Sequence, residues 1–177
     1  MLNQNSTKQL LQQKFDDIKL RFGVEEKDIN SVKKLVEATG FFNEEEIEIA
    51  QELVIEGYKL GEQSSYRFIF ADYDGWCVGY TCYGRIPCTL YSYDLYWIVV
   101  HPQYQGKGIG KILLKETESM ITKSNGKRIY VETSMKAQYR STRQFYERCG
   151  YGVASILEEF YGPGDAKVIY NKIVHSE

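Results

Sequence analysis

The chain has 177 residues, of which 43% are hydrophobic and 26% charged, and its formal net charge is −2 at pH 7. This length suits one domain with a substantial core, and the weak net charge gives no electrostatic reason to expect a nucleic-acid partner. No apolar run approaches the length of a membrane span, so no membrane partner is expected either.

The beginning of the chain is expected to be a leader that precedes one domain. Residues 1–15 are polar, rich in Gln and without a core pattern, whereas residues 16–177 are the expected domain, without internal repeats or a linker. No secretory signal opens the chain, which favours a cytoplasmic location. Ile18, Leu20 and Phe22 alternate with polar residues and predict a first strand.

Two helices are predicted after this strand. Asp28 is the expected N-cap of the first helix, and Gly40 is the expected end of it, because glycine readily adopts the left-handed conformation found there. Asn43 is the expected N-cap of the second helix. The three glutamates that follow Asn43 lie in the first turn, where the helix dipole favours negative charge.

Three strands are predicted in the middle of the chain. Residues 66–71 and 76–83 flank Asp74-Gly75, which is a strong hairpin signal. Pro87 interrupts the pattern, so the chain is expected to change direction there. Residues 93–100 are nearly continuous in large side chains, which predicts a central strand covered on both faces.

The second half of the chain alternates between helices and strands. A helix is expected from Ile109 to near Gly126, and residues 128–133 predict the next strand. A short helix is expected over residues 138–149, and residues 151–174 read as a final hairpin. The predicted order is β-α-α-β-β-β-α-β-α-β-β, which makes this a mixed α/β protein.

A glycine-spaced loop joins the central strand to the helix that follows it. Gly106, Gly108 and Gly110 lie in this loop. Glycine lets the backbone approach a ligand closely because it has no Cβ. The start of a helix carries unpaired N–H groups and a partial positive charge, so the loop is suited to an anion. We therefore expect a phosphate group there; a turn without a ligand is the alternative.

Three phosphate-binding motifs compete for this loop. A Walker loop fails because Ile112 stands where Ser or Thr is required, and a dinucleotide fingerprint fails because the glycines have the wrong spacing. The third motif is Gln/Arg-x-x-Gly-x-Gly/Ala, which Gln105, Gly108 and Gly110 match after the strand end Val100-His101-Pro102. This segment resembles the pyrophosphate loop of the GCN5-related N-acetyltransferase (GNAT) superfamily.

Two further segments carry the same resemblance, which covers about residues 16–174. Gln144 to Tyr151 is similar to the Phe-Tyr-x-x-x-Gly-Phe/Tyr segment of the family, and Asp74-Gly75 before Val78-Gly79-Tyr80 is similar to its second hairpin. The resemblance implies a mixed, mostly antiparallel twisted sheet of about seven strands with helices on both faces. It also implies acetyl-CoA as the cofactor.

The resemblance further implies which residues bind acetyl-CoA. Tyr139 stands where many members have an Asn that contacts the cofactor, and Thr142 stands where a small Ala is common, so the contacts from this helix are expected to differ. Lys107 and Lys111 flank the loop and can add positive charge to the anion site. The full set is Ile98, Val99, Val100, Gln105, Gly106, Lys107, Gly108, Ile109, Gly110, Lys111, Tyr139 and Thr142.

Three residues are candidates for catalysis. Tyr146 matches the tyrosine that protonates the leaving thiolate in the family; a core tyrosine is the alternative. Asp94 falls where histone-type members hold a general-base glutamate, so it is the first choice for the base; a structural residue at a strand start is the alternative. Glu132 is the second choice, and its alternative is a structural partner for Arg143 or Lys136.

The expected function is an acetyl-CoA-dependent N-acetyltransferase that acts on a primary amine of a small molecule or peptide by direct attack in a ternary complex. The alternative that is not an enzyme is a regulatory domain that binds acyl-CoA without catalysis. The alternative enzyme is a dinucleotide-binding oxidoreductase. Tyrosines and carboxylates in residues 91–94 and 158–161 favour a cationic substrate. The four cysteines form no C-x-x-C pair, so no metal site is expected. A homodimer is a possible state of assembly.

Overall fold

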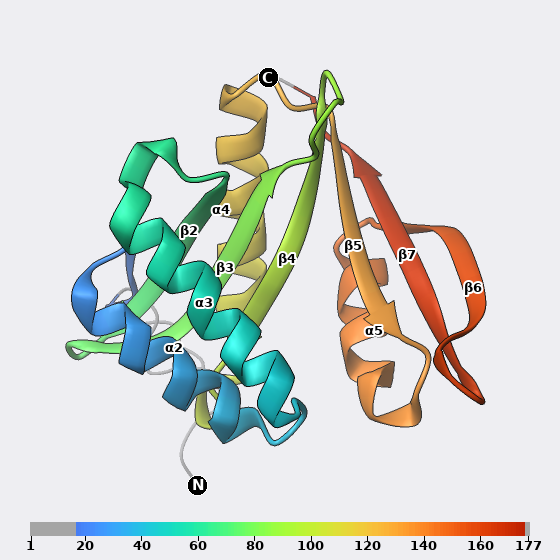
Figure 1. Cartoon of the computed structure of the whole chain (residues 1–177), viewed down its shortest axis with the longest axis horizontal. Helices are drawn as coiled ribbons and strands as arrows, with labels where there is room; N and C mark the ends of the chain where they lie inside the picture. The colour runs from blue at the N-terminus through green and yellow to red at the C-terminus, as the bar shows by residue number, and fades with distance from the viewer. Residues whose placement is uncertain (1–16, 176–177) are drawn as a thin grey trace, which may run out of the picture.

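The computed structural model describes residues 17–175, and its strands form one seven-stranded sheet (Figure 1). The expected mixed, mostly antiparallel sheet is confirmed: the strand order is β1-β2-β3-β4-β5-β7-β6, and only β4 and β5 pair in parallel. The predicted leader over residues 1–15 lies outside the described residues. In chain order the elements are β1 Lys19–Phe22, α2 Glu26–Thr39, α3 Glu44–Leu60, β2 Tyr66–Tyr73, β3 Trp76–Arg85, β4 Ser92–Val100, α4 Ile109–Lys123, β5 Arg128–Ser134, α5 Arg140–Arg148, β6 Gly152–Gly162 and β7 Asp165–Ile173.

Helices cover both faces of the sheet, as expected. Helices α2 and α3 pack on one face of β2, β3 and β4, and α4 packs on the other face of the same strands (Figure 1). The first interface buries Val32, Val36 and Val54 completely, and the second buries Leu113 and Ile121 completely. These apolar contacts hold the central strands between two helical layers. No helix of residues 17–175 combines the length and the apolar character needed to cross a bilayer.

The ends of α2 and α3 were predicted from local sequence signals, and the structure tests those predictions. Gly40 ends α2 with a φ of 67°, and the Asn43 side chain accepts a hydrogen bond from the Glu46 N–H at 2.9 Å, so both predicted ends are confirmed. The prediction that Asp28 is the N-cap of α2 is wrong, because the helix begins earlier with Glu25 as its N-cap. Asp28 is instead fully buried, and its two carboxylate oxygens accept hydrogen bonds from Arg21 at 2.8 and 2.9 Å.

Strands β4 and β5 pair over only three residues and then separate. Their paired residues are Ser92 with Arg128, Tyr93 with Ile129, and Asp94 with Tyr130. Beyond this point the two strands diverge, which Figure 1 shows as a V that opens downward. Backbone groups on that side of the second half of β4 therefore have no partner among the strands of residues 17–175.

A β-bulge lies in β4 just after the last paired residue. Tyr83 of β3 pairs with Leu95, and the preceding β3 residue, Cys82, pairs with Trp97. Tyr96 is therefore the extra residue in β4. A bulge changes which side chains face each side of a strand. As a result Asp94 and Trp97 lie on the same face of the sheet although three positions separate them.

Candidate active site

Two cavities adjoin one another where β4 and β5 separate. The larger has a volume of about 680 Å³ and the smaller about 360 Å³. The residues that line both are Phe41, Ile98, Val100, Gln105 and Thr142. The shared lining means that a ligand in one cavity can reach a ligand in the other at the second half of β4.

The smaller cavity is built around the glycine loop and the start of α4. Gly106 and Gly108 have φ values of 71° and 88°, and a Cβ added at either would meet no atom within 4 Å. Gly108 is the N-cap of α4 and supplies no capping side chain, and the first turn of α4 contains no acidic residue. Within residues 17–175, the N–H groups of this turn therefore face an open space without a protein partner, which suits a phosphate group.

The loop is held in place by one of its own side chains. The Gln105 side-chain N–H donates a hydrogen bond to the carbonyl oxygen of Val100 at 2.9 Å. This bond ties the loop to the end of β4. The protein itself therefore holds the glycine loop in this conformation, and an anion that binds there does not have to order the loop.

Most of the predicted cofactor-binding residues line the smaller cavity. Val99 and Tyr139 line only the larger cavity. Lys107 lines neither, and its ammonium lies 4.9 Å from the centroid of the Tyr104 ring. The predicted residues that line the smaller cavity are Ile98, Val100, Gln105, Gly106, Gly108, Ile109, Gly110, Lys111 and Thr142.

The larger cavity is lined by aromatic rings and carboxylates. Phe42 packs on Trp97 with ring centroids 4.9 Å apart, and Phe41 lies 6.0 Å from Tyr139. The carboxylates that line it are those of Glu46, Glu132 and Asp165, and the lining contains one lysine, Lys136. Aromatic faces and carboxylates are the groups that bind an ammonium ion.

Glu132 and Asp94 share one face of the sheet close to the point where β4 and β5 separate. Asp94 pairs with Tyr130, and Glu132 follows two residues later on the same face. The Glu132 carboxylate accepts a hydrogen bond from the Lys167 ammonium at 2.5 Å. Glu132 lines the larger cavity, whereas Asp94 is not part of its lining.

Burial makes Asp94 an unusual carboxyl group. Asp94 is half-buried, and burial, assisted by the negative charge of Glu132, raises its pKa to about 6. The positive charge of Lys167 acts in the opposite direction. A carboxylate with a pKa near neutrality is a better proton acceptor at pH 7 than an ordinary aspartate and is still mostly ionised there.

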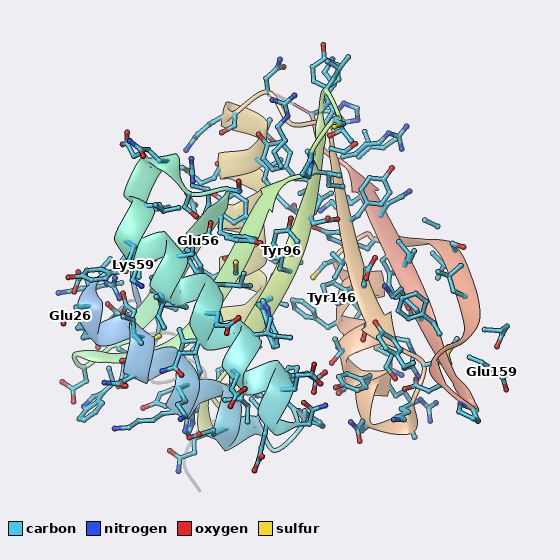
Figure 2. All side chains as sticks on the ribbon, in the orientation of Figure 1. Glu26, Glu56, Lys59, Tyr96, Tyr146 and Glu159 are labelled. Carbon is cyan, nitrogen blue, oxygen red and sulfur yellow. The ribbon has the colours of Figure 1, made fainter. Side chains whose placement is uncertain are left out.

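Tyr146 reaches the larger cavity from α5, on the other face of the sheet. Only 4% of its surface is exposed, and burial raises the pKa of its hydroxyl. Figure 2 shows the side chain extending from α5 toward the gap between β4 and β5. The phenol therefore stays protonated at neutral pH and borders the cavity on the side opposite to the carboxylates.

The structure adds lining residues that are not among the predicted site residues. Phe41, at the end of the connection from α2, lines both cavities. Ser141, Phe145 and Arg148 of α5 line the smaller cavity, and Tyr161 of β6 lines the larger one. The spacing of Ser141, Phe145 and Arg148 at four and three residues is a helical signal, but it does not distinguish a ligand-facing stripe from a core-facing one.

Comparisons with known proteins agree on the family and the fold. Residues 31–151 match the model of the acetyltransferase (GNAT) family. A solved structure from Desulfovibrio desulfuricans, described as an acetyltransferase of the GNAT family, is 42% identical, with a TM-score of 0.87 over 88% of this chain and 98% of that chain. No curated protein sequence matches the chain.

More distant structures share the fold. The ribosomal-protein-S18-alanine N-acetyltransferase from Escherichia coli is 18% identical, with a TM-score of 0.69 over 90% of this chain and 96% of that chain. The PaiA N-acetyltransferase from Thermoplasma acidophilum, solved in complex with coenzyme A, is 21% identical, with a TM-score of 0.69 over 88% of this chain and 98% of that chain.

Proposed function

The chain belongs to the acetyltransferase (GNAT) family, whose members use acetyl-CoA, and we propose that it transfers the acetyl group to a primary amine of a small molecule or peptide. The amine attacks directly, within a complex that holds both substrates. The observation that carries this proposal is the pair of adjoining cavities at the separation of β4 and β5. One cavity suits a phosphate-bearing ligand and the other suits a cationic amine.

The residues of the smaller cavity fit acetyl-CoA. When bound, acetyl-CoA supplies an activated acetyl thioester. The α4 N–H groups and the open loop at Gly106 and Gly108 would hold its pyrophosphate, and Arg148 and Lys111 add positive charge to the same cavity. Backbone N–H groups of the second half of β4, near Ile98, would polarise the acetyl carbonyl.

Asp94 is the proposed general base, with Glu132 as the second candidate. An alkyl amine has a pKa of about 10.4 and arrives charged, so it must lose a proton before it can attack. The raised pKa of Asp94 favours it for this role. Glu132 instead accepts a hydrogen bond from Lys167. Because Asp94 is not part of the cavity lining, we propose that a water molecule carries the proton to it.

Tyr146 is the proposed general acid. Its hydroxyl is protonated at neutral pH and borders the cavity on the side opposite to Asp94 and Glu132. The acid and the base thus serve opposite ends of the transfer: one gives a proton to the leaving sulfur and the other takes a proton from the amine.

The substrate is proposed to be cationic. The lining of the larger cavity has three carboxylates against one lysine, together with several aromatic rings. A regulatory domain that binds acyl-CoA without chemistry is the second candidate, but it has no need for this amine-binding lining. The family assignment argues against the dinucleotide-binding alternative.

Thermal-shift titration and free-thiol release test this proposal together. We expect acetyl-CoA and CoA to raise the melting temperature, NAD to leave it unchanged, and at least one amine from a panel of alkylamines, aminoglycosides, polyamines and peptides to release CoA. Equal stabilisation by NAD would overturn the cofactor assignment. Binding of acetyl-CoA without thiol release for any amine would favour the regulatory domain.

A cytoplasmic location and the state of assembly stay predictions. Cys77, Cys82, Cys88 and Cys149 are all free thiols, which supports a reducing compartment.

A further inference from the structure

We propose that the Lys167 ammonium fills a built-in cation site beside the larger cavity and thereby makes the enzyme select acceptors with one ammonium group over acceptors with two. This inference rests on the proposed function. It names a specificity-determining residue that lies outside the lining of the cavity itself.

The surroundings of Lys167 form a complete ammonium site. Its Nζ donates a hydrogen bond to Glu132 at 2.5 Å and lies 3.7 Å from the centroid of the Phe160 ring and 5.7 Å from that of Tyr161. Only 12% of the Lys167 side chain is exposed. A carboxylate combined with two aromatic faces in a partly desolvated position is the arrangement that binds a substrate ammonium in other sites.

This cation site is continuous with the larger cavity. Glu132 and Tyr161 are shared, because both contact Lys167 and both line the cavity. The position of the Lys167 ammonium is therefore the place that a second ammonium of a substrate would take if the lysine did not fill it.

An irregular segment of β6 builds the aromatic side of the site. Leu157 pairs with Lys167 and Gly162 pairs with Asp165, so the four residues 158–161 stand opposite Ala166 alone. Glu159 has a φ of 52°, which is unusual for a residue other than glycine, and Figure 2 shows it pointing away from the protein. The bulge places the Phe160 and Tyr161 rings against the Lys167 ammonium.

The charges that line the larger cavity leave room for one cation. Lys167 compensates Glu132, and Lys136 compensates Asp165 at 3.2 Å. Glu46 accepts a hydrogen bond from the neutral backbone N–H of Asn43 at 2.8 Å, and within residues 17–175 it has no ion-pair partner. Among the lining carboxylates, one is thus available to a charged substrate, and a second ammonium would meet the positive charge of Lys167 instead.

A matched pair of substrates tests the proposal. We would compare pentylamine with 1,5-diaminopentane, which differ only in the second amine, at constant ionic strength. Lys167→Met keeps the apolar stem of the side chain and removes its charge. In this variant we expect kcat/KM for the diamine, divided by kcat/KM for the monoamine, to rise about tenfold. The second ammonium of the diamine can then bind the carboxylate and the two aromatic rings that Lys167 occupied. Lys167→Gln, which retains a hydrogen-bond donor, should shift the ratio in the same direction.

Lys172→Met is the control. Lys172 lies on the same strand but on the opposite face of the sheet, where its ammonium donates to Glu118 at 2.8 Å and lies 5.4 Å from the Tyr151 ring centroid. The substrate ratio should not change in this variant. An unchanged ratio in a folded Lys167 variant, or an equal rise in Lys172→Met, would overturn the proposal.

Calorimetry separates this proposal from the proposed function. Diaminopentane titrated into protein saturated with CoA should bind about tenfold more tightly to Lys167→Met than to the wild type, whether or not the amine is acetylated. If the wild type acetylates no amine, the proposed function fails while the cation site is still tested by this measurement. Equal diamine affinity in the two proteins would contradict the cation site even if amines are acetylated.

Discussion

Asp94 and Tyr130 form the last paired rung between β4 and β5, and beyond them the two parallel strands separate. This position leaves Asp94 half-buried next to the opening, with Glu132 two residues beyond Tyr130 on the neighbouring strand. The base candidates therefore lie at the point where the sheet changes from a continuous layer into the wall of a cavity.

Replacing Asp94 by Asn should remove most of the activity. We expect kcat/KM for the amine to fall about 10²-fold or more, which is the usual contribution of a general base. In the wild type, kcat/KM should decline as the pH falls through about 6, because the Asp94 carboxylate becomes protonated. A pH–rate profile measures both effects. Asp74→Asn, which changes an exposed turn carboxylate, is the control, and an acid limb that persists in Asp94→Asn would assign the base elsewhere.

The same substitution should stabilise the fold at neutral pH. Burial raises the pKa of the Asp94 carboxyl above its value in the unfolded chain. Between about pH 4 and 6 this carboxyl is therefore more often protonated in the folded protein than in the unfolded chain. The contribution of Asp94 to stability is present at low pH and is lost as the pH rises through about 6. Asp94→Asn should thus raise the melting temperature at pH 7.5 and change it little at pH 4; the opposite trend would contradict the raised pKa.

Tyr146→Phe should lower turnover and leave the affinity for acetyl-CoA nearly unchanged. The change removes only a hydroxyl, so packing should survive, and a proton donor for the leaving thiolate acts mainly in the transition state. We expect kcat to fall about 10²-fold when chemistry limits the rate, while the acid limb assigned to Asp94 persists. Tyr80→Phe removes a fully buried hydroxyl that lines neither cavity and should leave kcat unchanged. Equal kcat values for Tyr146→Phe and the wild type would make Tyr146 a core residue.

Gly108→Asp should abolish tight CoA binding. A carboxylate at this position enters the open space in front of the α4 N–H groups and repels the pyrophosphate. The φ of 88° also strains any residue other than glycine, so some stability should be lost. Gly75→Asp is the matched control, because Gly75 has a φ of 80° and equally open surroundings in the β2–β3 turn. Calorimetry should show reduced CoA affinity only in Gly108→Asp; reduced affinity in both variants would point to general destabilisation.

Arg148→Met should raise KM for acetyl-CoA about fivefold with little change in kcat. Arg148 lines the smaller cavity at the end of α5, where a guanidinium can bind a phosphate group. High salt should reduce the difference between variant and wild type, because it screens this charge. Arg140→Met, at the exposed start of the same helix and outside both cavities, should leave KM unchanged. A KM effect that salt does not reduce would indicate a packing role.

Local sequence signals predicted the parts of the site that a short segment builds by itself. The spacing of Gln105, Gly108 and Gly110 was enough to expect an anion cradle at the start of a helix, since glycine conformation and free helix N–H groups are properties of that segment alone. Asn43 and Gly40 likewise marked helix ends through local hydrogen bonds and backbone conformation. The N-cap prediction for Asp28 was wrong because α2 begins three residues earlier, which makes Asp28 its third helical residue. Its carboxylate accepts hydrogen bonds from the Glu25 N–H and from Arg21.

How the segments meet depends on contacts between residues that are far apart in the chain. The separation of β4 from β5 and the bulge at Tyr96 depend on pairing between strands, which no single strand sequence encodes. Placing β7 between β5 and β6 brings Lys167 to Glu132 across 35 positions, and the β6 bulge adds Phe160 to the same group. Contiguous residues were thus enough to predict the family and the loop proposed to bind phosphate, because the motifs for both lie in short segments. The proposed acceptor site is formed by side chains from separate strands and helices, so it depends on strand order and on the divergence of β4 and β5.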